Sequence, residues 1–367
     1  MAAFVNGVSS VRIGSSTASS FCGNVGRVAV RSSIKVAAPK RRFTTVMAAS
    51  GAALEDWLMN NEVKSELSTT IRAMFAACKE ISYKVRTASC DKVACFNDFG
   101  DEQLAIDILS DKVIFENLTN CGTCATASSE EVPKEVPISE NGSYSVAFDP
   151  LDGSSIIDTN FSVGTIYGIW PGSKLTGITG RELSASGLCI YGPRTTMSLA
   201  IDGVEGAHEF LLMDDFSGRH GSWVHVAEFF SVAEGKLFAP GNLRAAQDND
   251  GYKELIDYYN SNKYQLRYTG GMVPDVNQIL VKGKGVFCNP ASPTAKAKLR
   301  VLYEVAPIGF LMEAGGAKSS EGKQSVLDIP IDSTEVKSQC CFGSENEVKR
   351  FEEMVGVPDF AETSVNP

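Results

Sequence analysis

The chain has 367 residues, with 43% hydrophobic and 21% charged side chains, a composition typical of a globular protein with one large or two ordinary domains. No run of about 18 apolar residues occurs, so we expect no membrane-spanning helix. The formal net charge is −10, and removing the seven positive charges of residues 1–50 leaves −17 for the rest of the chain. A body this acidic would repel a nucleic-acid backbone, so we expect no nucleic-acid partner.

Residues 1–50 differ from the rest of the chain in composition. They contain no Asp or Glu, seven Lys or Arg and nine Ser, and the first acidic residue is Glu55. A basic, serine-rich and acid-free N-terminus is typical of an organelle transit peptide, and a disordered basic tail is the alternative. We expect residues 1–50 to be a disordered transit peptide with a processing region in the run Val46–Ser50.

A long helix is the first element that the pattern predicts. Apolar residues recur at steps of three to five from Leu54 to Val85, which indicates an amphipathic helix with one buried face. A loop from Cys90 to Gly100 follows. Asp101 then stands where an N-cap is expected, ahead of a second helix that extends to about Leu118.

The middle of the chain is rich in strands. Tyr144–Phe148 is predicted to be a strand that stops at Asp149-Pro150, because proline cannot donate to a strand ladder. Four more strands, separated by glycine-rich turns, are predicted at Gly164–Trp170, Gly187–Tyr191, Met197–Ile201 and Glu209–Met213.

Helices and strands alternate again after Pro240. We expect a helix at Tyr252–Tyr259, a strand near Val286, and a helix that starts at Pro293 with Ser292 as its N-cap. This change of pattern predicts a domain boundary near residue 240, which divides the chain into regions 51–240 and 241–367.

The most informative motif is the sequence Asp149-Pro150-Leu151-Asp152-Gly153-Ser154-Ser155 at a predicted strand end. Its two carboxylates, three residues apart, offer the oxygen ligands that Mg²⁺ prefers. The Gly-Ser-Ser segment can open a helix whose free backbone N–H groups suit a phosphate. A metal ion and a phosphate could therefore meet here, although Asp and Gly also form ordinary turns.

Further carboxylates could join this motif if the fold brings them together. The candidates come from three other segments: Asp101, Asp107, Glu130, Glu131 and Glu304. Each of them alone is most often a solvated surface charge. The chain has only three histidines, and no Cys/His set has the spacing of a zinc site, so we expect no structural zinc.

Several motifs resemble, in order and content, the fructose-1,6-bisphosphatase family, which is part of a wider group of lithium-sensitive, metal-dependent phosphatases. The motifs are Gly100–Asp107, Ser129–Glu131, Phe148–Ser155, Leu266–Met272 and Lys298–Glu304. The resemblance covers essentially residues 55–357. It implies a layered α/β sandwich of the fructose-1,6-bisphosphatase and inositol-phosphatase type, with mixed sheets and flanking helices. Region 51–240 would then be a metal- and phosphate-binding subdomain, and region 241–367 a sugar-binding subdomain.

The resemblance also implies roles for individual residues and a homodimer. Two or three Mg²⁺ ions per subunit would be held by Glu130, Glu131, Asp149, Asp152, Glu304 and the carbonyl oxygen of Leu151. Catalysis would use Asp101 and Asp107, which orient or deprotonate the attacking water, together with Glu131. The substrate, a sugar bisphosphate, would contact Asp152, Gly153, Ser154, Ser155, Asn242, Arg267, Tyr268, Met272, Lys298 and Arg300. In this view Arg300 and Glu304 lie on one helix, with Arg300 turned to phosphate and Glu304 to metal.

Two departures from the family pattern bear on the substrate. Where the family usually has tyrosines near the distal phosphate, this chain has Ala245 and Cys288. Losing two bulky hydroxyl donors should reshape that end of the pocket, as a longer substrate requires, and neutral drift is the alternative. We therefore expect hydrolysis of the 1-phosphate of a seven-carbon 1,7-bisphosphate. A fructose-1,6-bisphosphatase, or an enzyme that accepts both sugars, is the alternative.

The cysteines indicate the same branch of the family. Cys90 and Cys95 stand where plastid members that act on a seven-carbon sugar carry a light-regulated disulfide, reduced by thioredoxin. The resemblance therefore implies a thiol-activated enzyme of the Calvin-Benson cycle in the chloroplast stroma, with thioredoxin as a partner. Buried free thiols at this position, or a rival redox pair at Cys121 and Cys124, are alternatives.

Two functions of other classes stay open. One is a protein that binds metal or senses sugar phosphates but has lost catalysis, and the other is a structural partner in a chloroplast assembly.

Overall fold

The computed structural model describes residues 51–87, 95–96, 102–103, 105–214 and 221–357, and of residues 95, 96, 102, 103 and 214 only the backbone course. All of them belong to one unit, Pro39–Pro367. The predicted transit peptide, residues 1–50, lies outside the described residues, and so do Cys90 and Asp101. Within the described ranges, the structure has no helix that is both long enough and apolar enough to cross a membrane.

The helices follow the apolar periodicity of the chain. In the longest of them, Ile71, Met74, Phe75, Cys78 and Ile81 are all fully buried at helical spacing, which gives the helix one apolar face. The described helices are α1 Leu54–Asn60, α2 Ser65–Thr87, α3 Ala105–Cys121, α4 Asp250–Ser261, α5 Met272–Lys282, α6 Ala306–Ala314 and α7 Glu345–Met354. Shorter helical segments are η1 Ser154–Thr159, η2 Gly180–Glu182, η3 Leu243–Gln247, the π-helical η4 Val301–Val305 and η5 Val326–Asp328.

The strands form two larger sheets and one small pair. Their bounds are β1 Cys95–Phe96, β2 Glu102–Gln103, β3 Cys124–Ser129, β4 Val136–Pro137, β5 Tyr144–Asp152, β6 Val163–Pro171, β7 Ala185–Tyr191, β8 Thr195–Ile201, β9 Ala207–Asp214, β10 Gly221–Phe229, β11 Ala233–Pro240, β12 Gln265–Leu266, β13 Lys284–Asn289, β14 Lys318–Ser320 and β15 Cys340–Gly343. The eight-stranded sheet has the order β10-β9-β8-β7-β6-β5-β3-β4, and the five-stranded sheet has the order β12-β11-β13-β15-β14. Both sheets are mixed, because β3 pairs with β5 in parallel and β11 pairs in parallel with both of its neighbours.

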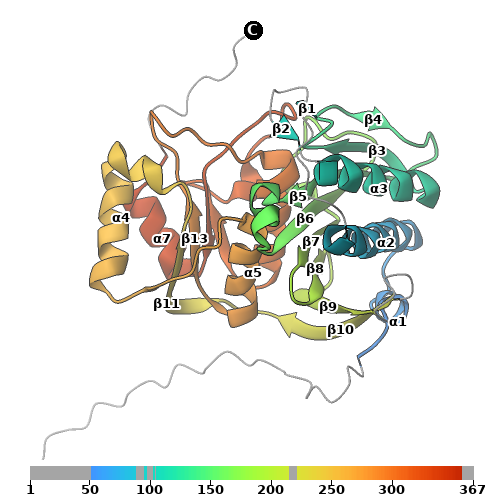
Figure 1. The fold of residues 1–367 in the computed structure, drawn as a ribbon, viewed down its shortest axis with the longest axis horizontal. Helices are drawn as coiled ribbons and strands as arrows, with labels where there is room; N and C mark the ends of the chain where they lie inside the picture. The colour runs from blue at the N-terminus through green and yellow to red at the C-terminus, as the bar shows by residue number, and fades with distance from the viewer. Residues whose placement is uncertain (1–50, 88–94, 97–101, 104, 215–220, 358–367) are drawn as a thin grey trace, which may run out of the picture. The chain divides into compact units, whose positions relative to one another are not determined.

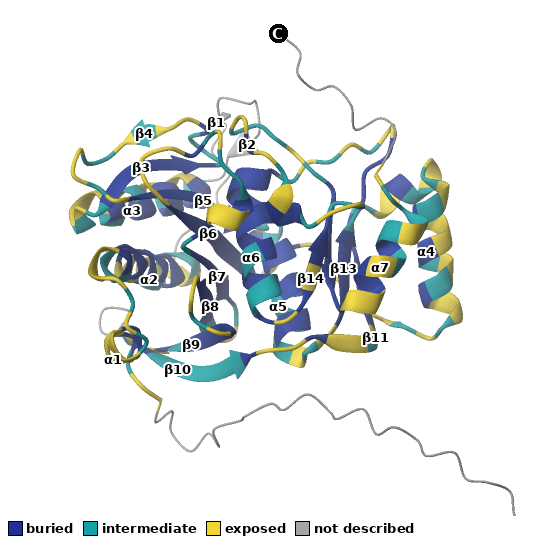
Figure 2. Cartoon of the chain, turned by 180° about the vertical axis from the view of Figure 1, so that it is seen from behind, coloured by how far each residue is buried: buried dark blue, intermediate teal, exposed yellow. Residues whose placement is uncertain are grey.

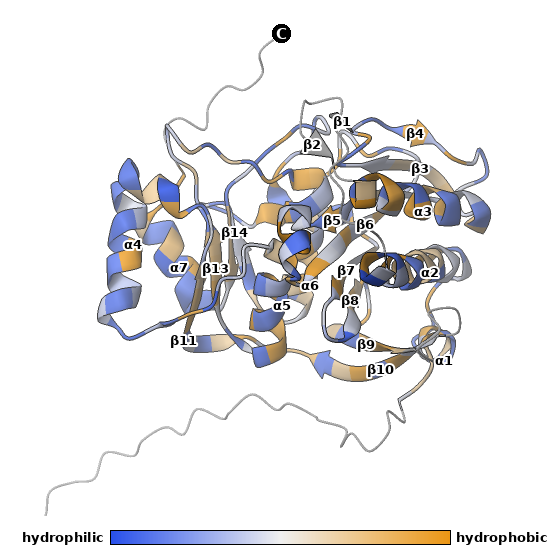
Figure 3. Ribbon diagram, viewed as in Figure 1, coloured by the Kyte–Doolittle hydropathy of each residue, from blue (hydrophilic) through white to orange (hydrophobic). Residues whose placement is uncertain are grey.

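Helices and sheets alternate in layers (Figure 1). Helices α2 and α3 cover one face of the eight-stranded sheet, α5 and α6 lie between the two sheets, and α4 and α7 cover the far face of the five-stranded sheet. The central strands of both sheets are buried, the edge strand β10 is only partly buried, and the outer helices expose one side (Figure 2). Hydrophilic residues follow the outer faces of α4 and α7 (Figure 3). The predicted layered α/β sandwich with mixed sheets is therefore confirmed.

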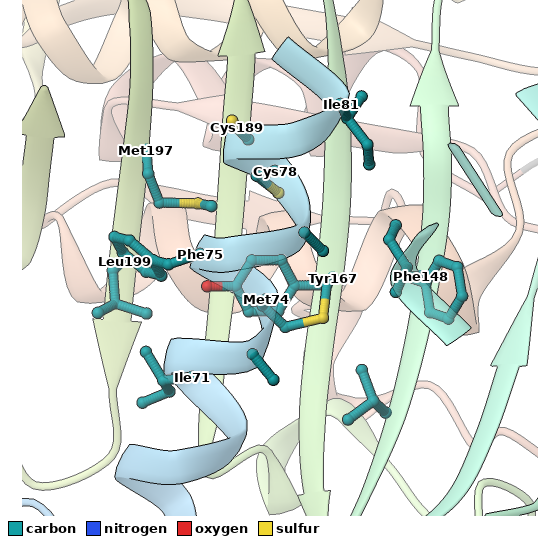
Figure 4. Packing of buried hydrophobic residues seen from close by; sticks show 14 of the residues in the cluster. Ile71, Met74, Phe75, Cys78, Ile81, Phe148, Tyr167, Cys189, Met197 and Leu199 are labelled. Carbon is teal, nitrogen blue, oxygen red and sulfur yellow. The ribbon is translucent and has the colours of Figure 1, made fainter. Parts of the chain in front are cut away.

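Side chains of α2 pack directly onto the eight-stranded sheet. Met74, Phe75 and Cys78 lie over Tyr167 and Cys189 of the strands below (Figure 4). All five of these side chains have an exposed fraction of 1% or less. Burying groups of this size stabilises the fold by about 1.5–3 kcal/mol for each large apolar side chain, so this interface fixes the helical layer on the sheet.

The first helix predicted from the sequence is in fact two helices. The break between α1 and α2 lies at Asn61–Lys64, where Glu62 has a φ of 53°, a left-handed conformation that an α-helix excludes. The side-chain amide of Asn61 donates to the carbonyl oxygen of Trp57 over 2.8 Å and closes α1. Both helices bury residues in the same core, so the apolar spacing continues across the break and did not reveal it.

Strand β5 extends farther than predicted. It continues through Pro150 to Asp152 and carries an irregularity between Asp149 and Asp152. Pro150 lies within this bulge and has no ladder partner in β6, so its missing N–H is tolerated. Its carbonyl oxygen accepts a hydrogen bond from the hydroxyl of Thr165 over 2.8 Å. The bulge also re-aims the two aspartates, which a regular strand would point to opposite faces.

The helix predicted to start at Pro293 is wrong. Residues 293–299 are irregular, and the hydroxyl of Ser292 accepts from the N–H of Ala295 within a local turn. The helical segment begins only at Val301. Arg300 precedes it with an extended backbone, φ −85° and ψ 133°. The side chains of Arg300 and Glu304 are therefore not an i, i+4 pair on one helix.

Candidate active site

Three carboxylates from three distant segments meet at one edge of the eight-stranded sheet. Oxygen atoms of Glu130, Asp149 and Glu304 all lie within 4.8 Å of one another. Glu130 directly follows β3 and Asp149 lies near the end of β5. Because these two strands are parallel neighbours, their carboxyl ends reach the same edge, where ligand sites of mixed α/β sheets commonly form.

Backbone hydrogen bonds hold these carboxylates in place. Asp149 accepts from the N–H of Leu151 over 2.9 Å, within the bulge of β5. Glu304 accepts from the N–H of Arg300 over 2.6 Å and so closes the start of η4. Asp152 accepts from the N–H of Val273 in the first turn of α5 over 2.8 Å. The strand end, η4 and α5 therefore share one rigid frame around the acidic group.

The electrostatics of this group are unfavourable without a cation. Burial, followed by repulsion from Glu130, raises the pKa values of Asp149 and Glu304 well above the ordinary range. Burial raises the pKa of Asp152 to about 7, partly offset by the hydrogen bond from Val273. Carboxylates packed this closely favour either protons or a bound cation. An all-oxygen set of this kind fits a hard divalent ion such as Mg²⁺.

Arg300 neutralises part of this charge. Its guanidinium forms an ion pair with Glu130, and its side chain is only 4% exposed. The predicted phosphate contact of Arg300 is a different role, which stays a prediction.

The remaining predicted metal and catalytic residues that the structure describes do not belong to the group of three carboxylates. Leu151 is buried in β5, between the two aspartates. Glu131 follows Glu130 directly and is half-buried, but it does not belong to the group of three carboxylates. Asp107 is 3% exposed in the first turn of α3, and Asp101 lies outside the described residues. Their predicted roles stay predictions.

The predicted phosphate-binding turn lies beside the acidic group. Gly153 has a φ of 82° and opens η1, which contains Ser154 and Ser155. Its Cα also lies close to Gly271 at the start of α5, because a Cβ added there would come within 3.4 Å of the Gly271 Cα. Free N–H groups at a helix start suit a phosphate, so the start of η1 offers donors next to carboxylates that suit a metal.

A basic hollow lies farther along the second half of the chain. It has a volume of about 560 Å³ and is lined by Asn242, Arg244, Lys296 and Lys298, among others. The side-chain amide of Asn242 donates to the carbonyl oxygens of Pro290 and Ala295 over 2.8 and 3.0 Å, which shapes the wall. Asn242 and Lys298 were predicted, whereas Arg244 and Lys296 were missed. The alternation of Lys296 with Lys298 was the available signal.

The other predicted sugar contacts lie at or just before the start of α5, and Tyr268 among them is close enough to feel the charges of both Asp152 and Arg244. Met272 is the first residue of α5 and is buried. Arg267 and Tyr268 lie just before α5 and are exposed, and the Arg267 guanidinium donates only to the neighbouring Leu266 carbonyl among the interactions that the structure records.

The two substitutions that bear on the substrate are both buried. Ala245 and Cys288 belong to the cluster beneath α4, together with Tyr252. The Tyr252 hydroxyl donates to the carbonyl oxygen of Gly241 over 2.7 Å, one residue before Asn242 of the basic hollow. The core at this place is therefore filled without the two tyrosines of the family pattern.

The predicted redox pair, Cys90 and Cys95, stays a prediction. Cys90 lies outside the described residues, and Cys95 is described only as part of β1, which pairs with β2. In the rival pair, Cys121 and Cys124 are both free thiols. Burial raises the pKa of Cys124 to about 12, which makes it a poor nucleophile at neutral pH.

Comparison with known proteins gives a consistent assignment. Residues 49–228 match the family model described as fructose-1-6-bisphosphatase, N-terminal domain, and residues 232–356 match the C-terminal domain of the same family. A curated protein of Spinacia oleracea, named sedoheptulose-1,7-bisphosphatase, chloroplastic, is 52% identical over 346 residues, which are 94% of this chain and 88% of that protein. A fructose-1,6-bisphosphatase class 1 of Pelobacter propionicus is 34% identical over 311 residues, 83% of this chain and 93% of that protein.

The fold agrees with these matches. The crystal structure of a Toxoplasma gondii protein, described as a candidate sedoheptulose-1,7 bisphosphatase, superposes with a TM-score of 0.77 and 38% identity, over 83% of this chain and 98% of that chain. Since both family models match and the carboxylates of the resembling motifs meet at one sheet edge, this chain belongs to the fructose-1,6-bisphosphatase family.

Proposed function

We propose that the protein hydrolyses the 1-phosphate of sedoheptulose 1,7-bisphosphate, in a reaction that needs Mg²⁺, to give sedoheptulose 7-phosphate and phosphate in the Calvin-Benson cycle. The single observation that carries the chemistry is the group formed by the buried Asp149 and Glu304 with the half-buried Glu130 at the end of β5. The choice of sugar is supported by the higher identity to the Spinacia oleracea sedoheptulose enzyme, 52%, than to the Pelobacter propionicus fructose enzyme, 34%.

The residues present fit a divalent metal ion, because the single positive charge of Arg300 does not balance the negative charges of the clustered carboxylates. Two or three Mg²⁺ would be held by Glu130, Glu131, Asp149, Asp152, Glu304 and the Leu151 carbonyl. When bound, they supply Lewis-acid neutralisation of the phosphoryl oxygens and activation of water.

The chain's own groups supply position and proton transfer. Ser154 and the N–H groups around it would hold the scissile phosphate beside the acidic group. Asp107, buried at the start of α3, and Asp101 would orient the attacking water and accept its proton. Asp152 ties the phosphate-binding turn to α5 through Val273, so the reacting groups are held at fixed positions.

The basic hollow around Arg244, Lys296 and Lys298 would receive the second phosphate. Three cations around an open space of about 560 Å³ suit a phosphate at the end of a sugar. The sugar itself would pass Met272 and Tyr268, which lie along the chain at the start of α5.

A fructose-1,6-bisphosphatase or an enzyme for both sugars is the second candidate, because the Pelobacter propionicus relative belongs to the same family and matches 83% of this chain. Phosphate release from both bisphosphates, measured on the purified protein with and without Mg²⁺, separates the two. We expect the higher kcat/KM for the seven-carbon sugar. Equal or higher values for fructose 1,6-bisphosphate would favour the second candidate, and no release from either sugar would favour a protein that only binds metal or sugar.

Regulation, location and assembly complete the proposal. We propose that residues 1–50 direct the chain to the chloroplast stroma, because the Spinacia oleracea relative is named as a chloroplastic protein. We also propose that the mature enzyme is a homodimer.

Oxidation of Cys90 and Cys95 would displace the segment that leads to Asp101, and thioredoxin would restore activity by reduction. A Cys95→Ser variant should keep full activity under oxidising conditions. The division into subdomains near residue 240 stays a prediction.

A further inference from the structure

A second cluster of metal-ligating side chains lies far along the sheet from the acidic group. It joins two of the three histidines in the sequence, His208 of β9 and His225 of β10. Their facing ring nitrogens, Nδ1 and Nε2, are 3.2 Å apart. One carboxylate oxygen of Glu228 lies with them, and all three ligand atoms are within 4.8 Å of one another.

A bulge in the edge strand builds this arrangement. Among the described strands, β10 pairs with β9 alone and forms the edge of the eight-stranded sheet, and a single bridge joins its Val224 to Ala53. His225 and Glu228 are three residues apart, which in a regular strand places their side chains on opposite faces. The register shifts between His225 and Ala227, and this extra residue turns both side chains to the same face. Glu228 then stands directly opposite His208. Bulges commonly re-aim side chains in this way at functional sites.

The outer nitrogen of the His208 ring is committed to a backbone acceptor. His208 Nε2 lies 3.1 Å from the carbonyl oxygen of Glu205, which can only accept, so this nitrogen carries the proton. The inner nitrogen of His208, Nδ1, therefore turns its lone pair toward Nε2 of His225, and the space between the two rings can take a proton or a metal ion.

The spacing of the two facing ring nitrogens suits a metal ion bound by both of them. Two nitrogens on one tetrahedral Zn²⁺, each at about 2.05 Å, lie about 3.3 Å apart, close to the observed 3.2 Å. A ring N–H donated to a backbone carbonyl is also the usual support of a zinc-bound histidine.

We propose that His208, His225 and Glu228 form a second metal site, distinct from the Mg²⁺ site, for a d-block divalent cation such as Zn²⁺. Two imidazoles and one carboxylate prefer such an ion to Mg²⁺. A fourth ligand position is left for water. This inference does not rest on the proposed phosphatase function.

The site joins the start of the folded chain to the sheet edge. The indole of Trp57 in α1 lies over His208, with ring centroids 4.6 Å apart, and α1 lies beside β9 and β10 (Figure 1). The N–H of His225 also donates to the carbonyl oxygen of Ala52 over 3.0 Å. A bound ion would hold the β9–β10 hairpin in the shape on which α1 packs. Its role is therefore structural.

The test uses the full chain saturated with Mg²⁺, so that the oxygen-rich site is occupied, and adds Zn²⁺ alone as the probe. Bound zinc is counted after equilibrium dialysis, and its ligands are read by zinc K-edge X-ray absorption, which distinguishes nitrogen and oxygen from cysteine sulfur. The variants are His225→Gln and Glu228→Gln. Glu205→Gln is the matched control, because this exposed side chain lies nearby while its backbone carbonyl is retained.

We expect one zinc ion per chain, a nitrogen and oxygen ligand shell with two imidazoles, and a zinc-dependent rise in Tm. His225→Gln should weaken zinc binding at least tenfold and abolish the rise in Tm, and Glu205→Gln should change neither. If the wild-type protein binds no zinc under Mg²⁺ saturation, or binds it through sulfur, the pair is only a hydrogen-bonded one and the proposal is wrong. The wild-type spectrum alone can contradict the proposal, so the test is still decisive if a variant fails to fold.

Discussion

The charges of single residues explain why the acidic group destabilises the fold without a cation and yet can bind one. Asp149 and Glu304 are buried beside Glu130, and burial together with repulsion raises the pKa of each. Arg300 compensates only part of this charge through Glu130. Proteins keep such arrangements where a cation or a reaction requires them, so removing one charge should have opposite effects on stability and on activity.

Replacing Glu304 by Gln tests this opposition. In the absence of Mg²⁺ the variant should unfold at a higher temperature than the wild type, because one buried negative charge is gone while its oxygen can still accept from the Arg300 N–H. Phosphatase activity should fall by about a hundredfold or more, because a metal ligand is lost. Thermal unfolding with chelator and a phosphate-release assay measure the two effects.

The control is Glu345→Gln, which removes an equal charge from an exposed position in α7 and should change neither quantity. A Glu304→Gln variant that is less stable without metal and still fully active would show that the cluster is not a metal site.

Arg244 provides a prediction about the distal phosphate. Its replacement by Gln removes one of the three cations around the basic hollow, and the loss of a charge-assisted contact of about 1.5–3 kcal/mol should raise KM for the bisphosphate about tenfold or more. Steady-state kinetics check this. Lys253→Gln, an exposed residue of α4, is the comparison, and an unchanged KM in Arg244→Gln would remove the hollow from the substrate site.

Residue types alone could indicate the ligands but not their partners. The motif around Asp149 and Asp152 is readable because acidic and glycine residues adjoin a strand end. The ion pair of Arg300 with Glu130 was not predictable, since the two residues are 170 positions apart. The facing histidines were missed for the same reason, because their meeting depends on a hairpin and a bulge.

At the scale of single elements, α7 carries a buried acid that links stability to pH. Glu347 accepts from the Ser344 hydroxyl over 2.8 Å at the start of the helix, and burial raises the pKa of its carboxyl from 4.5 to about 7. The protonated form is favoured in the folded protein. This contribution to stability is complete below pH 4.5 and is lost as the pH rises through 7.

A Glu347→Gln variant should therefore be more stable than the wild type at pH 8, by up to about 3 kcal/mol. The difference should shrink steadily toward pH 5. Urea unfolding at several pH values measures it, with Glu345→Gln as the reference. A constant difference between pH 5 and pH 8 would mean that Glu347 titrates at its ordinary pKa in the folded chain.

The elements show where sequence patterns succeed and where they fail. The strands β6 to β9 match their predicted ranges closely, because alternating and continuous apolar runs between glycine-rich turns leave little choice. Pro150 did not end β5, because a bulge absorbs the missing donor. Pro293 did not start a helix, because Ser292 turns the chain locally instead. Single prolines and caps are weak signals when tertiary contacts compete with them.

At the scale of the whole molecule, layering positions the site. The parallel pairing of β3 with β5 brings Glu130 to Asp149. η4, which lies against the same sheet, adds Glu304, and the first turn of α5 holds Asp152 of β5 through the N–H of Val273. Periodicity predicts each layer, but not which strand ends share an edge. The family resemblance supplied that information, because its motifs already imply that the carboxylates converge.

Metal binding should act on the whole molecule through its stability. Mg²⁺ relieves the repulsion among the buried carboxylates only in the folded state, so at a concentration of about 100 times its Kd it should stabilise the protein by about 2.7 kcal/mol. Thermal unfolding at increasing Mg²⁺ checks this, and Glu304→Gln should respond less. A Tm that does not depend on Mg²⁺ would contradict a metal site at the end of β5.

The central claim is that scattered acidic side chains form one metal-dependent phosphatase site for a seven-carbon sugar. The most direct measurement is phosphate release from sedoheptulose 1,7-bisphosphate by the purified, reduced protein, with Mg²⁺ and with chelator. The account predicts steady release that requires Mg²⁺ and that is lost in Glu304→Gln. Release that continues at the same rate under chelation, or no release with Mg²⁺ present, would contradict it.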